Sequence, residues 1–220
     1  GAMRVIAFTT QKGGSGKSTL ASSLAVAAAE AGEKVFIVDL DPQASLIRWS
    51  KERSKQEAPI GVEAVTPGKL ANVLAALAKN GVTLAIIDTP GADGAAAEAA
   101  IRHSNLCIIP ARPNAFDLWA SETTRRAIKS LRREYVFLLN QCPSMANSPR
   151  VAEGIASLES LGGLLNPLIT SRVDFQDASR LGLGVTEYAP SGETAHEVRK
   201  LWTSVRKRIG KAAGSSRKAA

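Results

Sequence analysis

The sequence predicts an α/β protein with a doubly wound, mostly parallel β-sheet that carries helices on both faces. Two observations predict this class. Short, β-branched apolar segments alternate with longer segments of helical periodicity, and the first apolar segment leads into a glycine-rich loop that opens the first helical one. The apolar segments are almost continuously hydrophobic, which is typical of parallel strands buried on both faces. Connections between such strands are nearly always right-handed crossovers.

The strands are predicted from their runs of valine, isoleucine, leucine and phenylalanine. Five segments have this composition: 4–10, 34–40, 83–89, 105–111 and 135–140. The segment 61–65 (GVEAV) is a candidate for a further short strand. Alanine-rich or amphipathic segments separate the strands and are predicted to be helices: 17–31, 43–55, 68–79, 94–102 and 117–133. Beyond residue 140 the pattern weakens, and we expect helices at 149–161 and 192–212 with a possible strand near 166–171.

Length and composition fit a single domain over residues 3–209. The chain has 220 residues, of which 45% are hydrophobic, enough for a complete core. Gly1 and Ala2 are interpreted as the remnant of a removed tag. No apolar run approaches the roughly 18 residues of a membrane span, and two cysteines argue against a disulfide-stapled secreted domain. We therefore expect a cytoplasmic protein.

The positive charge is concentrated at the C-terminus. Of the 28 lysines and arginines, eight lie in residues 199–220, where there is no acidic residue, so residues 1–198 are balanced at 20 basic against 20 acidic. A basic segment of this kind suits nucleic acid or an anionic membrane, or serves only as a solubilising tail. Residues 210–220, rich in Gly, Ser, Lys and Ala, are expected to form a flexible basic tail.

The glycine-rich loop has the composition of a phosphate-binding loop. The usual pattern G-x-x-x-x-G-K-[ST] is met except at its first position, which is Gln11. Backbone N–H groups of such a loop converge on phosphate oxygens at a helix N-terminus. Side chains then complete the site: Lys17 would reach the β- and γ-phosphates, Ser18 would bind Mg²⁺, and Thr19 would donate near the α-phosphate. The residues expected to bind nucleotide here are Lys12, Gly13, Gly14, Ser15, Gly16, Lys17, Ser18 and Thr19.

Carboxylates follow two other strands. Asp88 ends the apolar run of AIIDTPG, where a carboxylate can hold Mg²⁺ through water. The second strand runs into DLDPQ, and if it continues that far, Asp39 and Asp41 share one face, because side chains in a strand alternate. One of these two could position the attacking water. DLDPQ could also be no more than a turn at the strand end.

These motifs resemble those of the ParA/MinD family of deviant Walker-A ATPases, within the P-loop NTPases. KGGSGKST at 12–19 matches the family pattern KGGxGK[ST], and VDLDPQ at 38–43 and IIDTP at 86–90 resemble its next two motifs. VTEYAPSG at 185–192 resembles its C-terminal region, so the similarity covers most of the chain. The chain looks most similar to short ParA proteins of the plasmid or protein-cluster positioning type.

The resemblance implies a function and a set of roles. Lys12 would be the signature lysine that reaches the partner's nucleotide across an ATP-sandwich homodimer, and Lys17 the Walker lysine. Asp41 would orient the water, Asp39 would assist near the metal, Asp88 would be the Walker-B carboxylate, and Asn140 would lie near the adenine. The protein would be an ATPase that needs ATP and Mg²⁺, dimerises on ATP, binds nucleoid DNA and is released when a ParB-like or adaptor partner stimulates slow hydrolysis. Its cargo could be a plasmid, a chromosomal locus or a protein cluster.

The basic C-terminal helix could bind either of two ligands, duplex DNA or an anionic membrane. Ala195, Val198, Leu201, Trp202, Val205 and Ile209 recur at steps of three or four and form an apolar stripe with a basic outer face. A ParA-like protein would use that face for non-specific duplex DNA, whereas a MinD-like protein would lay a basic amphipathic helix on an anionic membrane. We favour DNA over stable membrane association, because the tail after Ile209 has no bulky apolar residue. The candidate DNA-binding residues are Arg172, Arg180, Arg199, Lys200, Arg206 and Lys207.

A relative with the same loop, the iron protein of nitrogenase-like reductases, holds a [4Fe–4S] cluster with two cysteines per subunit. Cys107 lies in a predicted buried strand and Cys142 follows a strand end. Both positions are typical of core cysteines rather than cluster ligands. An electron-transferring reductase is therefore the less favoured alternative.

Overall fold

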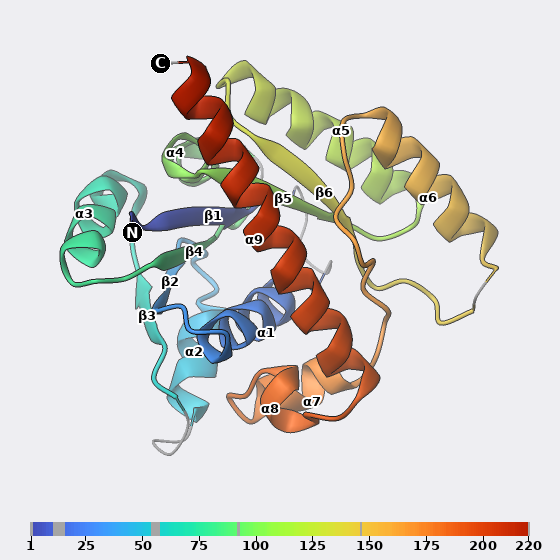
Figure 1. The fold of residues 1–220 in the computed structure, drawn as a ribbon, viewed down its shortest axis with the longest axis horizontal. Coiled ribbons are helices and arrows are strands. Elements are labelled where there is room, and N and C mark those ends of the chain that lie inside the picture. Colours follow the sequence, from blue (N-terminus) through green and yellow to red (C-terminus); the bar gives the residue numbers. More distant parts are fainter. Residues whose placement is uncertain (1, 11–15, 54–57, 92, 146, 220) are drawn as a thin grey trace.

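Six parallel strands form one sheet at the centre of the molecule (Figure 1). The computed structural model describes residues 2–10, 16–53, 58–91, 93–145 and 147–219, and for residues 211–219 only the course of the backbone. The strand order is β3-β2-β4-β1-β5-β6, and every neighbouring pair is parallel. The strands are β1 (Arg4–Phe8), β2 (Val35–Asp39), β3 (Gly61–Ala64), β4 (Leu84–Asp88), β5 (Leu106–Ala111) and β6 (Tyr135–Leu139). The predicted fold class is confirmed.

The predicted helices are present, with ends that differ by a few residues. They are α1 (Lys17–Glu30), α2 (Ser45–Glu52), α3 (Leu70–Lys79), α4 (Gly94–His103), α5 (Ala115–Ser130), α6 (Pro149–Ser160) and α9 (Glu193–Ala219). A 3₁₀ turn, η1 (Pro67–Lys69), leads into α3. Two short helices, α7 (Asp174–Arg180) and α8 (Val185–Tyr188), were not predicted. The strand expected near 166–171 is reduced to single bridges, Phe137 with Leu164 and Cys142 with Thr170.

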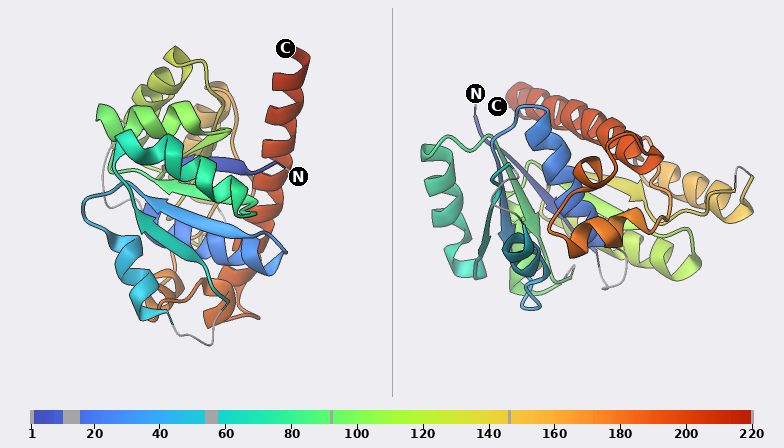
Figure 2. Two further views of the ribbon diagram at one scale, coloured as in Figure 1. Left: turned by 90° about the vertical axis from the view of Figure 1, so that its left-hand side faces the viewer. Right: turned by 90° about the horizontal axis from the view of Figure 1, so that it is seen from below.

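Side chains alternate along the strands and divide the core into two layers. Ile6 and Phe8 of β1 pack in one cluster with α1 and α9, whereas Val5 and Ala7 pack on the opposite face with α3 and α4. On that second face, β5 and β6 pack against α5 and α6. Two views at right angles show these layers, with α1 and α9 side by side on one face of the sheet (Figure 2). The expectation of helices on both faces is therefore confirmed.

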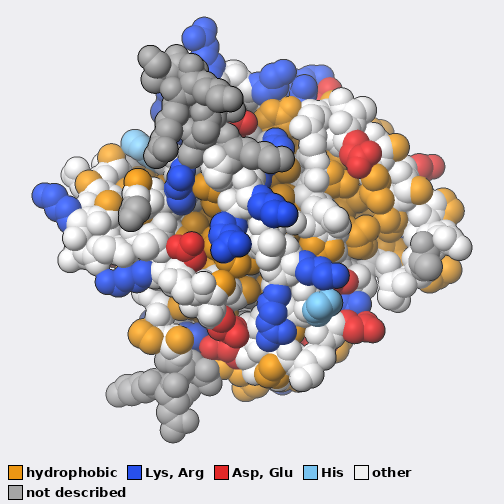
Figure 3. All heavy atoms as spheres, viewed as in Figure 1, with side chains coloured by type: hydrophobic (Ala, Val, Ile, Leu, Met, Phe, Trp, Pro, Cys, Tyr) orange, Lys and Arg blue, Asp and Glu red, His pale blue; other side chains and the backbone are white. Residues whose placement is uncertain are grey.

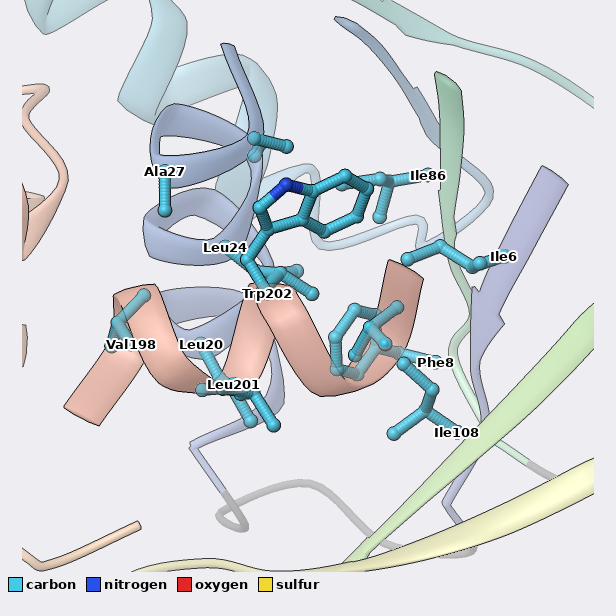
Figure 4. Close-up of a cluster of buried hydrophobic side chains, with 14 of the residues drawn as sticks. Ile6, Phe8, Leu20, Leu24, Ala27, Ile86, Ile108, Val198, Leu201 and Trp202 are labelled. Atoms are coloured by element: carbon cyan, nitrogen blue, oxygen red, sulfur yellow. The ribbon is translucent and has the colours of Figure 1, made fainter. Parts of the chain in front are cut away.

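The apolar stripe of α9 is part of the core. Its six residues are all buried, and Figure 4 shows Val198, Leu201 and Trp202 directed at α1 and the sheet, where Leu24 and Ile86 lie beside the indole. This burial fixes α9 along the sheet and turns its lysines and arginines outward.

The helix α9 continues to Ala219, past residue 212 where the sequence pattern ends it. The tail expected at 210–220 is thus helical up to that point, and its flexibility stays a prediction. None of the helices in the described part of the chain combines the length and hydrophobicity that a membrane span requires.

Candidate nucleotide site

The glycine-rich loop ends at Gly16, directly before α1. Gly16 has φ of 72°, a left-handed conformation that glycine adopts without steric cost. A Cβ atom added there would lie 2.5 Å from Nε2 of Gln141 and 3.3 Å from Nδ2 of Asn140. The backbone conformation therefore favours glycine, and any larger residue would also displace the Gln141 side chain. The other loop residues predicted to bind phosphate, Lys12, Gly13, Gly14 and Ser15, lie outside the described residues.

Lys17, Ser18 and Asp88 meet at the carboxyl end of the sheet. The ammonium group of Lys17 forms an ion pair with Oδ1 of Asp88 and donates a hydrogen bond of 2.6 Å to the carbonyl of Thr89. The Ser18 hydroxyl donates to Oδ2 of Asp88 over 3.0 Å. Lys17 and Asp88 are both buried, and a buried charge is costly unless it is paired. The pair thus holds a cation at the N-terminus of α1.

A second carboxylate lies beside this pair. Asp39 and Asp88 are the last residues of neighbouring strands and are register partners. Oδ1 of Asp39 accepts a hydrogen bond from the Asp41 N–H at 3.0 Å, whereas Oδ2 is buried and has no hydrogen-bond partner among the described residues. Burial raises the pKa of Asp39, and the nearby negative charge of Asp88 adds to this effect although the Asp41 N–H opposes it.

The side chains of Ser18, Asp39 and Asp88 offer only oxygen donors, which are the ligands that Mg²⁺ prefers. The buried oxygen of Asp39 has no hydrogen-bond partner among the described residues. A bound ion or its water would supply one and remove that cost in free energy. Ser18, Asp88 and Asp39 therefore fit the magnesium site predicted from the sequence. The ion would neutralise charge on the phosphates when bound.

Asp41 does not share a strand face with Asp39, and that expectation is wrong. The strand β2 ends at Asp39, and Asp41 begins a turn in which its Oδ1 accepts from the Gln43 N–H at 2.9 Å and its carbonyl accepts from the Ala44 N–H at 2.9 Å. The turn reverses the chain because Ala44 adopts a left-handed φ of 54°. Asp41 is half-buried, and it stays beside Asp39, to which its N–H donates, although the two side chains are not on one face of a strand.

A pocket of about 240 Å³ adjoins the loop on the β6 side. Asn140 follows β6, is buried, and hydrogen-bonds through its N–H to the Ala111 carbonyl at 2.9 Å. The next residue, Gln141, has a left-handed φ of 51°, an uncommon conformation that brings its amide group over Gly16. The pocket is lined by Gly16, Thr19, Leu20, Asn140, Gln141, Thr170, Ser171, Arg172, Phe175 and Gln176. Of these, the sequence pointed to Asn140 and the loop; the wall from 170 to 176 has no periodic pattern that could have disclosed it.

The basic candidates for DNA divide into two groups. Arg199, Lys200, Arg206 and Lys207 are exposed on α9, and Figure 3 shows lysine and arginine side chains along the middle of the face that α9 crosses. Arg180 is also exposed. Arg172 differs, because its guanidinium lies 3.2 Å from a carboxylate oxygen of Glu193 and 3.2 Å from one of Glu197. Two carboxylates thus offset its charge.

Both cysteines are unsuited to hold an iron–sulfur cluster here. Cys107 lies within β5 and Cys142 follows β6, and both are completely buried in one apolar cluster. Burial raises the pKa of Cys107 to about 12 and that of Cys142 to about 11. Cluster ligands are thiolates, whereas these two thiols stay protonated at neutral pH.

Comparison with known proteins shows the family and the fold of this chain. A family model described as CobQ/CobB/MinD/ParA nucleotide binding domain (CbiA) matches residues 6–208. The "Maintenance of carboxysome distribution protein A" of Halothiobacillus neapolitanus is 27% identical over 201 residues, 86% of this chain and 90% of that protein. The protein of the same name from Gloeobacter kilaueensis is 37% identical over 127 residues, so that match spans 57% of each protein. The septum site-determining protein MinD from Pyrococcus horikoshii, solved with Mg-ADP, has the same fold, with a TM-score of 0.75, 20% identity and coverage of 96% of this chain and 98% of that one.

Proposed function

The chain belongs to the CobQ/CobB/MinD/ParA nucleotide-binding domain family, and we propose that it is a ParA-like ATPase that pairs around ATP, binds duplex DNA and positions a cargo. Its relatives include positioning ATPases of the ParA and MinD type. The observation that supports ATP hydrolysis most directly is the arrangement of Lys17, Ser18 and Asp88 at the end of the sheet, with the unsatisfied oxygen of Asp39 beside them.

Each of these residues has a distinct role in the proposed reaction. Lys17 exchanges Asp88 for phosphate oxygens and stabilises the charge that develops on them. Ser18 and Asp88 would hold Mg²⁺ with the help of Asp39, and the bound ion would neutralise charge on the phosphates. Asp41, beside Asp39, orients the attacking water. Since no residue of this set is a strong general base, intrinsic turnover is slow.

The 240 Å³ pocket beside Gly16 is the proposed place of the adenine. Asn140 and Gln141 offer amide donors and acceptors there, and Phe175 offers an apolar surface. The MinD structure with Mg-ADP supports a nucleotide and Mg²⁺ as the ligands of a site in this fold. The loop match KGGSGKST supports a second role, in which Lys12 of one subunit reaches the triphosphate of the other. Such a lysine makes dimerisation depend on ATP, because it interacts favourably only when the opposing site is filled.

The outer face of α9 is the proposed DNA-binding surface. Its exposed cations suit phosphate contacts without base recognition. The same helix argues against the MinD-like alternative. Binding of an amphipathic helix to a membrane requires a free apolar face, whereas the apolar face of α9 between Ala195 and Ile209 is buried against α1 and the sheet. Nucleoid association and release by a ParB-like or adaptor partner complete the proposed cycle, with a plasmid, a chromosomal locus or a protein cluster as cargo.

Co-sedimentation with ATP tests this proposal. Wild-type protein, Lys12→Ala and Asp41→Ala are mixed with non-specific duplex DNA or with anionic liposomes, with ATP or without it. We expect the wild type to sediment with DNA only when ATP is present, Asp41→Ala to remain on DNA because hydrolysis stops, and Lys12→Ala to stay in solution.

Lys79→Ala, at an exposed position at the C-terminal end of α3, is the matched control and should behave as the wild type. ATP-dependent sedimentation with liposomes but not with DNA would replace the proposal by the membrane alternative. A Lys12→Ala protein that dimerises and hydrolyses ATP normally would refute the role of Lys12.

A further inference from the structure

Two large aromatic side chains stand exposed at the start of α5. Phe116 is 74% exposed and Trp119 is 64% exposed. Their rings lie edge to face, with centroids 5.6 Å apart and planes at 77°. Aromatic residues are costly to leave in water, and tryptophan is enriched among the residues that dominate binding energy at protein interfaces. The pair is therefore a candidate anchor for a binding partner.

A groove of about 560 Å³ adjoins the pair. Trp119 forms part of its wall on α5, and its opposite wall is α6. Pro113, Leu118 and Leu161 give the groove an apolar floor. An aromatic anchor beside a groove allows one surface to offer both the inserted side chain and the receiving cavity.

Charges of both signs surround this groove. Arg112 pairs with Asp117 and Arg126 with Glu122, at 2.9 Å and 2.8 Å respectively. Arg150 and Glu153 are exposed on α6 at the groove wall. With Arg125, which donates to the Leu161 carbonyl at 2.7 Å, four arginines and three acidic side chains lie at or around the groove, whereas the last 22 residues of the chain carry eight positive charges and no negative ones.

This balance indicates what kind of partner fits. Two copies related by a two-fold axis present the same patch to one another, so a patch that pairs with itself must carry both signs. A surface built for a basic or an acidic partner would carry an excess of one sign. The face of α9 would repel its own copy, while the face around the groove would not.

The patch also lies at the nucleotide edge of the sheet. The helix α5 begins four residues after β5, at the carboxyl end of the strands, and β5 is the direct neighbour of β1, which leads into the glycine-rich loop. The Thr9 N–H, just before that loop, donates to the Ile108 carbonyl of β5 at 2.9 Å. The aromatic pair is thus next to the seam at which two nucleotide sites would face one another.

We propose that Phe116 and Trp119 are the apolar anchor of the ATP-bound homodimer, packing against the same pair and the α5–α6 groove of a second copy. This inference rests on the ATP-dependent dimer proposed above and adds to it the surface that stabilises the pair once ATP has brought it together. The Asn114 side chain accepts from the Asp117 N–H at 2.9 Å and caps the start of α5, the turn that carries Phe116.

Tryptophan fluorescence and sedimentation velocity test whether Phe116 and Trp119 are buried in the ATP-bound dimer. Trp49 and Trp202 are buried, so Trp119 is the solvent-exposed one of the three tryptophans and its emission reports on this surface. With a non-hydrolysable ATP analogue, we expect the wild type to dimerise and its emission to shift to shorter wavelength. Phe116→Ala keeps the reporter and should weaken the dimer about tenfold or more, with unchanged binding of a fluorescent ATP analogue to the monomer.

Tyr188→Ala, which removes an exposed aromatic ring on α8, is the matched control and should dimerise as the wild type does. A wild-type dimer with unshifted emission, together with a Phe116→Ala dimer of full affinity, would overturn the inference and leave the ATP-dependent dimer standing. A wild-type protein that stays monomeric with the analogue would overturn both.

Discussion

The salt dependence of DNA binding measures how many α9 cations contact phosphates. If Arg199, Lys200, Arg206 and Lys207 of both subunits make such contacts, about eight phosphates are neutralised and log K should fall with log[salt] at a slope of about −7. Binding would then weaken by roughly 2 × 10⁴-fold between 50 and 200 mM salt. These are upper bounds, because the Arg199 guanidinium also donates to the Pro190 carbonyl at 2.8 Å.

The informative variant is Lys200→Gln with Lys207→Gln, which removes four charges per dimer at exposed positions. We expect the slope to fall to about −3.6 and the loss over the same salt range to fall to roughly 150-fold. Fluorescence anisotropy of a labelled non-specific duplex, with a non-hydrolysable ATP analogue, gives both numbers. The control is Lys69→Gln with Lys79→Gln. Lys69 ends the turn η1 and Lys79 ends α3, which packs on the face of the sheet opposite to α9. Equal slopes for wild type and variant, or an equal reduction in the control, would refute α9 as the DNA surface.

Two further predictions concern the start of α5 and the start of α1. Burial acts to raise the pKa of Asp117, but the hydrogen bonds and charge of Arg112 outweigh it and hold that pKa below its usual value. Asp117→Asn should therefore lower the free energy of unfolding by about 1 kcal/mol at pH 7, and the difference from the wild type should shrink as the pH falls below about 4. Urea denaturation of both proteins at pH 7 and in acid measures the difference. A stability difference that persists in acid would contradict the prediction. Gly16→Ala should weaken binding of a fluorescent ATP analogue while circular dichroism shows a folded protein, because the left-handed φ of 72° disfavours alanine and the added methyl group would displace the Gln141 side chain beside the loop. Normal binding would show that the loop tolerates the displacement.

Much of the fold was predictable because local patterns and global structure agree. Continuous apolar runs such as 83–89 became central strands, and the stripe from Ala195 to Ile209 became the buried face of α9. The helices α7 and α8 were missed because seven and four residues are too few to establish a helical period. The strand expected near 166–171 failed for a related reason, since short apolar segments fit strand and loop equally well.

The site was predictable where a residue's place follows from the end of a strand. Asp39 and Asp88 meet because neighbouring parallel strands end in register. Asp41 was misplaced because the periodicity argument assumed a longer strand, whereas the carboxylates of Asp39 and Asp41 capture backbone N–H groups and start a turn. Arg172 was assigned to DNA from its motif alone, and its glutamate partners lie 21 and 25 residues further along the chain, a pairing that no local pattern reveals.

Those glutamates join the proposed adenine pocket to the proposed DNA surface. Glu197 of α9 accepts hydrogen bonds from the N–H and the hydroxyl of Thr170, at 3.0 and 2.9 Å, and also faces Arg172. Thr170 and Arg172 line the pocket, and the exposed cations of α9 begin two residues after Glu197. A nucleotide that moves this wall must therefore either move α9 or break contacts with it, and breaking them would leave half-buried charges unpaired. Contact between Arg172 and DNA would require its guanidinium to leave both Glu193 and Glu197. Loss of these ion pairs costs free energy, and that cost opposes DNA binding until another ligand offsets it.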